Sequence, residues 1–201
     1  MLAWRTDVPL GVSLPPPELA WAYCALVVLA AAAAVTDLRR GKIYNALTYP
    51  AIALGMIGHT LVGGITGGEG SLGLAGSLAG FATGFLPMFA AWMAGGVGGG
   101  DAKLMGAVGA LSGWRFTLSA MFYGLLAALV LAIIVMVSRR LTRRTLGRVW
   151  RFLLLALVPR GTVDPATADS PKVPMGLAFA LGVLAALAEA LAGASGWVLG
   201  I

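Results

Sequence analysis

The sequence contains very little cysteine, histidine or charge. Cys24 is its one cysteine and His59 its one histidine among 201 residues, so neither a disulfide framework nor a zinc site of several Cys and His ligands can be built. We therefore expect no metal and no cofactor. Charged residues make up 11% of the chain, against about 25% in typical soluble domains. This scarcity excludes a disordered chain that is kept soluble by its charge.

Apolar residues, in contrast, are abundant. They make up 59% of the chain, and the mean hydropathy is +0.91. A soluble fold of this size could not cover so much apolar side chain, because a large share of a small protein's surface faces water. The 29 glycines suit a bundle in which helices approach one another closely. The composition predicts an integral membrane protein.

Long apolar runs divide the chain into candidate membrane spans. Five runs are long enough or nearly so, and they cover residues 19–35, 43–65, 72–95, 116–138 and 173–201. A helix needs about 20 such residues to cross a bilayer core of about 30 Å. A sixth run, at residues 104–114, is too short to be assigned by length alone.

The distribution of basic residues decides whether the short run at residues 104–114 crosses the membrane. Residues 139–160 hold seven arginines, which is half of the 14 basic residues, and residues 39–42 hold three more. Loops rich in Lys and Arg stay in the cytoplasm. An even number of crossings must separate two cytoplasmic loops, so residues 104–114 must cross as well. The sequence therefore predicts an all-α, polytopic membrane protein with six transmembrane helices and both termini outside.

The same arguments give the domain organisation. We expect one membrane domain over residues 1–201, with an external segment at residues 1–18 and a basic cytoplasmic loop at residues 139–172. The loop lacks a recognisable domain and interleaved stacking aromatics, so we expect no binding of nucleic acid. Its arginines instead favour contact with anionic lipids.

Asp37 and Asp101 are the acidic residues that this topology brings to one face of the membrane. Asp37 follows the first predicted helix, and Asp101 follows a glycine run that ends with Gly98, Gly99 and Gly100. Two close carboxyl groups cannot both ionise easily, so such a pair can supply a general acid and a general base. Together they could activate a water for attack on a peptide carbonyl. The adjoining glycines would let a substrate backbone come close.

Structural roles and transport remain open for these acids. Asp37 could pair with Arg39 or Arg40 in water, and Asp101 could cap the short helix. A small transporter or proton channel could also use aspartates at the membrane edge. Transporters often show internal repeats, and no convincing repeat is present here.

Two further ionisable side chains lie inside apolar runs. His59 stands alone in the second run, where we expect a hydrogen-bonded interior residue. Glu189 lies in the last run, where we expect a polar contact between helices or at the interface.

The segment around Asp101 resembles a known motif. Residues 98–101, Gly-Gly-Gly-Asp, fit the G-x-G-D motif of intramembrane aspartyl proteases. With Lys103 and Leu104 they are similar to the G-G-x-G-G-G-D-x-K-L version of the type IV prepilin peptidase family. Presenilin-like proteases share G-x-G-D, but their first aspartate follows a tyrosine inside a helix, whereas Asp37 follows Thr36.

Two other segments resemble the same family, in the same order along the chain. Residues 37–45 are similar to its other aspartate segment, D-x-R-x-x-x-I-P-N, with Tyr44 in place of the proline and Asn45 at the end. Pro174 and Gly176 resemble its late proline-glycine helix start. The resemblance extends over roughly residues 20–190.

The resemblance implies a membrane aspartyl endopeptidase of the bacterial cytoplasmic (inner) membrane. It would cleave the leader peptide from type IV prepilins, which are single-span apolar helices, at the cytoplasmic membrane face. Larger family members carry a Cys-rich insert and also methylate the new N-terminus. A chain with one cysteine resembles the short, peptidase-only branch that serves Flp or tight-adherence pili. The implied catalytic pair is Asp37 and Asp101, and the implied substrate-binding residues are Gly98, Gly99, Gly100, Lys103, Asn45, Pro174 and Gly176.

Overall fold

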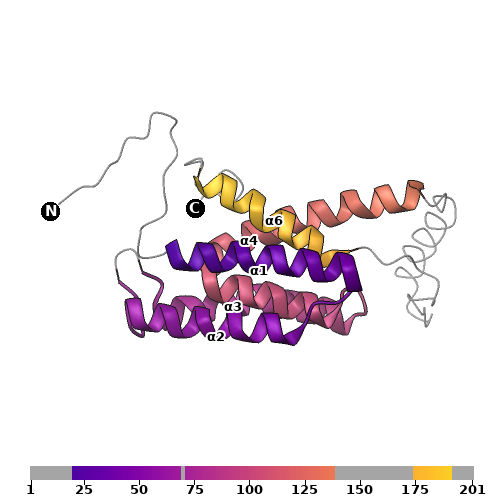
Figure 1. The fold of residues 1–201 in the computed structure, drawn as a ribbon. Coiled ribbons are helices and arrows are strands. Elements are labelled where there is room, and N and C mark those ends of the chain that lie inside the picture. The colour runs from indigo at the N-terminus through magenta and orange to yellow at the C-terminus, as the bar shows by residue number, and fades with distance from the viewer. Residues whose placement is uncertain (1–19, 69–70, 139–173, 192–201) are drawn as a thin grey trace, which may run out of the picture.

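The computed structural model describes residues 20–68, 71–138 and 174–191, and these residues form a bundle of helices (Figure 1). The helices are α1 (Ala20–Arg40), α2 (Asn45–Gly63), α3 (Gly73–Met93), α4 (Gly99–Ser138) and α6 (Met175–Leu191). No strand occurs in these described ranges, and one isolated bridge joins Gly68 to Ser71. The all-α prediction is confirmed. The expected external segment at 1–18 and the basic loop at 139–172 lie outside the described residues.

Four of the helices, α1 to α4, are long and apolar enough to cross a membrane, and α6 is an apolar helix of 17 residues. Large apolar side chains lie on the outside of the bundle, such as Leu61, which is 81% exposed, and Val28, which is 67% exposed. A lipid environment suits these side chains because it removes them from water. The protein is therefore a polytopic membrane protein, while the count of six crossings stays a prediction.

Helix α4 turns back on itself at Gly113. This glycine has φ 79° and ψ 173°, a conformation open almost only to glycine. Gly84 of α3 faces both Met105 and Thr117, which lie on opposite sides of Gly113 in the sequence. The helix therefore consists of two parts that both pass along α3.

The two parts correspond to the two apolar runs expected at residues 104–114 and 116–138. The first part begins at Gly99 because the last two glycines of the glycine run join the helix. Its residues 99–112 extend about 20 Å at 1.5 Å per residue, which is less than a bilayer core of about 30 Å. From the sequence we expected this short helix near residues 102–114, with added length from the glycine run before it, and it begins at Gly99.

Glycines allow α3 and α4 to approach closely. Gly80 lies against the backbone of Gly109, and Gly84 lies against the carbonyl of Met105. A Cβ atom at either glycine of α3 would overlap the backbone of α4. Small residues drive helix association in membranes in this way, because lipid offers no hydrophobic force between helices.

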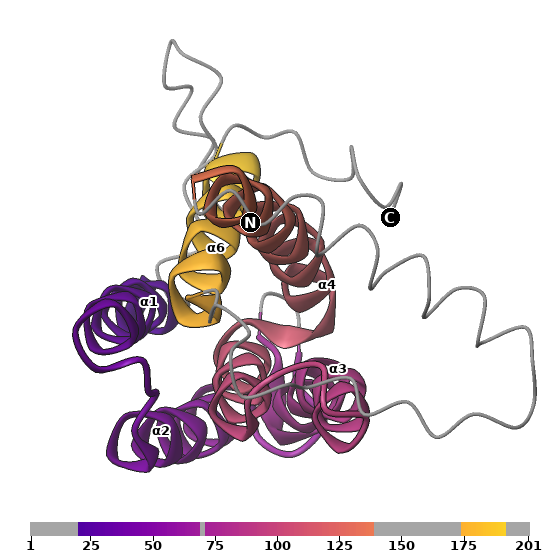
Figure 2. The same cartoon turned by 90° about the vertical axis from the view of Figure 1, so that its right-hand side faces the viewer.

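Helix α4 contacts each of the other four described helices. Viewed along the bundle, α1 lies beside α6 and α2 lies beside α3 (Figure 2). The connection from α1 to α2, the start of α6 and the end of α4 lie at one end of the bundle, on the right in Figure 1. A hydrogen bond from Lys103 to Asn45 places the start of α4 at this end as well.

Candidate active site

Asp37 lies in the last turn of α1, where its carboxylate meets the beginning of α6. Its Oδ2 atom accepts hydrogen bonds from the backbone N–H groups of Gly176, at 2.8 Å, and Leu177, at 3.3 Å. The side chain is half-buried. Asp37 is thus tied to a helix that begins almost 140 residues later in the chain.

The local sequence explains why α6 can receive this carboxylate. The first N–H groups of a helix have no partner inside the helix, and the positive end of the helix dipole favours an anion. Pro174 precedes the first residue of α6, where a proline is compatible with a helix start. At Gly176, a Cβ atom would come within 2.9 Å of Asp37 Cβ and 3.1 Å of its Cγ. Glycine is required there for the contact to form.

Asp101 lies in the first turn of α4, three residues after Gly98. Its Oδ2 accepts a hydrogen bond from the N–H of Gly98 at 3.0 Å, and the carbonyl of Gly98 accepts one from the N–H of Asp101, also at 3.0 Å. The bond from the Gly98 N–H to the Asp101 side chain is one half of a capping box, and the backbone carbonyl of Gly98 takes the place of an N-cap side chain. We considered Asp101 as the N-cap of this helix, but that position is taken by Gly98. Asp101 takes part in capping from the third helical position instead. Its side chain is only 9% exposed.

The carboxyl groups of Asp37 and Asp101 lie at the same end of the bundle, because Gly100, next to Asp101, packs against Ile43 in the connection that follows α1. They come from α1 and α4, two helices in direct contact. Glu189 is the one other acidic residue within the described ranges, and it lies close to Tyr123 on α4. The polar contact expected of Glu189 stays a prediction, and Glu189 lies near the end of α6, whereas Asp37 contacts the start of that helix.

Lys103 and Asn45 meet beside this pair. Lys103 Nζ donates a hydrogen bond to Asn45 Oδ1 at 2.9 Å, and the ammonium lies 5.1 Å from the centre of the Tyr49 ring. This contact joins the first residue of α2 to the N-terminal part of α4.

Comparison with protein families now gives this geometry a context. The model of the type IV leader peptidase family matches residues 24–133, which is more than half of the chain. The chain belongs to the type IV leader peptidase family. It is thus a membrane-embedded aspartic protease of the prepilin peptidase type, in a family that acts on prepilins. Searches among curated proteins and solved structures found no match to this chain.

The matched range includes both aspartates but ends before α6. Gly176 and Leu177, whose N–H groups bind Asp37, therefore lie outside the matched range. From the sequence, Pro174 and Gly176 were expected to bind substrate, and the contact of Gly176 with Asp37 was not predicted. The signal was the glycine directly after a predicted helix start, which indicates a close approach by another group.

The three glycines before Asp101 pack in different ways. Gly98 is exposed, and a Cβ atom there would lie 2.9 Å from Asp101 Oδ2. Gly99 faces the Trp92 indole, and Gly100 lies against the backbone and Cβ of Ile43. Only the first of them has an open surface beside the carboxyl group.

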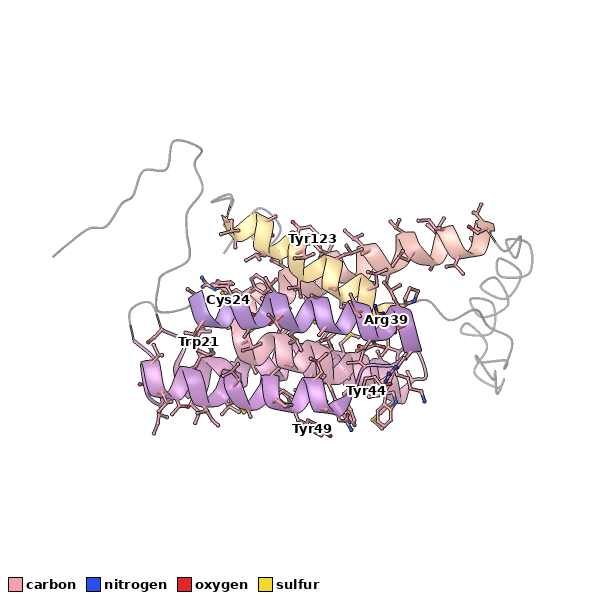
Figure 3. The ribbon with its side chains drawn as sticks, viewed as in Figure 1. Trp21, Cys24, Arg39, Tyr44, Tyr49 and Tyr123 are labelled. Atoms are coloured by element: carbon pink, nitrogen blue, oxygen red, sulfur yellow. The ribbon has the colours of Figure 1, made fainter. Side chains whose placement is uncertain are left out.

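The basic residues after Asp37 do not take the role of its ion-pair partners. Arg40 donates a hydrogen bond to the Tyr44 hydroxyl at 3.0 Å and stacks over its ring. Arg39 and Tyr44 both lie at the end of the bundle where α1 joins α2 (Figure 3). With Val35, Thr36 and Arg40 they line an open pocket of about 310 Å³. Asp37 contacts α6 instead.

The described part of the peptidase shows no cluster of three or more His, Cys, Asp or Glu side chains that could hold a metal ion. The chemistry available at this site is that of two carboxyl groups, backbone amides and one nearby ammonium group.

Proposed function

We propose that Asp37 and Asp101 are the catalytic pair with which this peptidase hydrolyses the leader peptide bond of prepilins. The observation that carries the proposal is the packing of the start of α4 against the segment that follows Asp37, where Gly100 lies against Ile43 and Lys103 bonds to Asn45. Of the three acidic residues within the described ranges, these are the two at this end of the bundle, since α6 begins beside Asp37 and Glu189 lies near its other end. Placing two ionisable groups together in a membrane-spanning bundle is costly, so function is the default explanation for the pair.

The proposed chemistry is general acid–base hydrolysis. The ionised carboxyl group removes a proton from a bound water while the protonated one donates a hydrogen bond to the substrate carbonyl oxygen. The exposed Gly98 leaves room for a substrate backbone beside Asp101. Lys103 and Asn45 lie next to the same helix start and are proposed to contact the substrate.

The substrate and the membrane face belong to the same proposal. We infer Flp-like prepilins because the sequence has one cysteine and so lacks the paired cysteines of the larger family members. The cytoplasmic face is supported by the position of the pair beside Arg39 and Arg40, since basic residues stay on that side.

Substitution of each aspartate by asparagine tests the pair. Asp37→Asn and Asp101→Asn should each lower the rate of prepilin cleavage by about 10²–10⁴-fold, because asparagine cannot exchange a proton. The double mutant should be no slower than either single mutant, because the two groups act as one unit. Cleavage is measured with purified protein in detergent and a candidate Flp-type prepilin.

Glu189→Gln is the matched control, since it neutralises the remaining acidic residue of the described ranges away from the site. This variant should cleave within about twofold of wild type. Near-normal cleavage by correctly folded Asp37→Asn would contradict the two-carboxylate mechanism.

The peptidase-only assignment has a separate test. Incubation of the purified protein with labelled S-adenosylmethionine and prepilin should transfer no methyl group to the product, and a chelator should leave the cleavage rate unchanged. Reproducible labelling of the mature N-terminus would show that methylation does not need the Cys-rich insert.

A further inference from the structure

The two carboxyl groups of the pair are held in very different ways. Asp37 Oδ2 receives two backbone N–H groups from the first turn of α6. Asp101 Oδ2 receives one, from Gly98, and its side chain is almost fully buried. Hydrogen bonds to a carboxylate favour its charged form, whereas burial favours the neutral form.

We propose that the first turn of α6 holds Asp37 as the ionised member of the pair, that Asp101 carries the proton in the resting enzyme, and that Gly176 is the positioning residue for Asp37. This inference rests on the proposed function and adds the role of each acid. The dipole of α6 acts in the same direction as its two N–H groups, since the positive end of a helix stabilises an adjacent anion.

The assignment gives each acid one task in the first step. Asp37 takes a proton from the water as the water oxygen forms its bond to the peptide carbon. Asp101 gives its proton to the carbonyl oxygen, so a neutral gem-diol results. In the second step the C–N bond breaks, the leaving nitrogen takes the proton from Asp37, and a gem-diol hydroxyl returns its proton to Asp101. Both acids end as they began.

Gly176 is essential to this arrangement because of its missing side chain. A Cβ atom at Gly176 would lie 3.1 Å from Asp37 Oδ2 and would push the carboxylate away from the N–H groups. The sequence alone suggested instead that Gly176 contacts the substrate. The two roles predict different kinetics, because a substrate contact affects KM whereas the position of a catalytic group affects kcat.

The kinetic test is Gly176→Ala, with Met175→Leu as the matched control in the same turn. Gly176→Ala should lower kcat by about 10–100-fold with KM within about twofold, because a small misplacement of a reacting group is costly. Met175→Leu keeps both N–H groups and the volume of the side chain, and should cleave at about the wild-type rate. A rise in KM with unchanged kcat would show a substrate contact and overturn the positioning role.

Infrared spectroscopy tests the location of the proton without substrate. The carbonyl band of a protonated carboxylic acid, identified by its shift in D₂O, should be present at neutral pH in wild type, in Asp37→Asn and in Glu189→Gln. It should be absent in Asp101→Asn, because Asp37 then stays ionised at the start of α6. The assignment is wrong if wild type lacks the band. It is also wrong if Asp37→Asn or Glu189→Gln loses the band, or if Asp101→Asn keeps it.

The two measurements separate this inference from the proposed function. If both asparagine variants stop cleaving but the band belongs to Asp37, the catalytic pair stands and the assignment of roles is wrong. If either asparagine variant cleaves normally, the catalytic pair itself is wrong, whatever the infrared result.

Discussion

At the scale of single residues, Gly98 shows how a backbone position controls a carboxyl group. Its N–H holds Asp101 Oδ2, and its own Cα lacks the methyl group that would meet the same oxygen at 2.9 Å. Gly96, two residues earlier in the same run, has ordinary space, because a Cβ there would lie 3.4 Å from the Ala91 carbonyl. Both glycines belong to one glycine-rich run, but only Gly98 lies against a carboxyl group.

This difference predicts that Gly98→Ala is much more harmful than Gly96→Ala. The new methyl group at residue 98 displaces the Asp101 carboxyl group, and a displacement of about 1 Å can lower the rate by about 100-fold. Gly96→Ala should cleave within about threefold of wild type. The measurement is kcat/KM for prepilin cleavage at equal amounts of folded enzyme, and equal effects of the two substitutions would contradict it.

At the scale of elements, the break in α4 leaves carbonyl groups that other helices must satisfy. The helix partners of Ala110 and Leu111 would lie beyond Gly113, where the helix has changed direction. Ser77 Oγ donates a hydrogen bond to the Ala110 carbonyl at 2.7 Å, and His59 Nε2 lies 2.8 Å from the Leu111 carbonyl. With no water in a bilayer core, such groups must find partners inside the protein. The interior hydrogen bond predicted for His59 is confirmed.

Ser77→Ala should therefore destabilise the bundle. It leaves the buried Ala110 carbonyl without its partner, which costs about 1–2 kcal/mol. Ser112→Ala is a suitable control, because the Ser112 hydroxyl donates to the carbonyl of Val108 within its own helix. The control should cost less than about 0.5 kcal/mol. The check is thermal or denaturant unfolding in detergent, and equal stability of the two variants would count against the capping role of Ser77.

At the scale of the whole molecule, the proposed catalytic and substrate-binding residues gather at one end of the bundle. The connection from α1 to α2 and the start of α6 lie together there, and the Lys103 to Asn45 hydrogen bond adds the start of α4 (Figure 1). Trp21 lies toward the other end (Figure 3). The distribution of basic residues predicts that the end with the aspartates faces the cytoplasm.

Cysteine labelling in intact cells tests this orientation. In a Cys24→Ser background, cysteines at Arg40 and Thr145 should be shielded from a membrane-impermeant thiol reagent, whereas a cysteine at Gly68 should react. Lysed cells provide the control, since all three positions should then be labelled. Reaction at residue 40 in intact cells would place the catalytic pair on the outer face.

Much of this protein could be predicted from the sequence because a bilayer restricts the possible structures. Apolar runs have to become helices, since only helices and closed barrels satisfy their backbone groups in lipid. The motifs around Asp37 and Asp101 likewise indicated the family, and the family match confirmed it. These features depend on residues close together in the chain, so they are visible without a structure.

What only the tertiary structure decided are contacts between distant segments. No local pattern shows that Gly176 supports Asp37, that Lys103 meets Asn45, or that Ser77 caps a break in α4. Each contact depends on how helices lie against one another, and helix packing is set by the combined shapes of two surfaces. The sequence alone determined that two acids are available at the membrane edge. The packing of α6 and α4 determined that one of them is held by two amide groups and the other is buried, because only folding brings those helices to the same place.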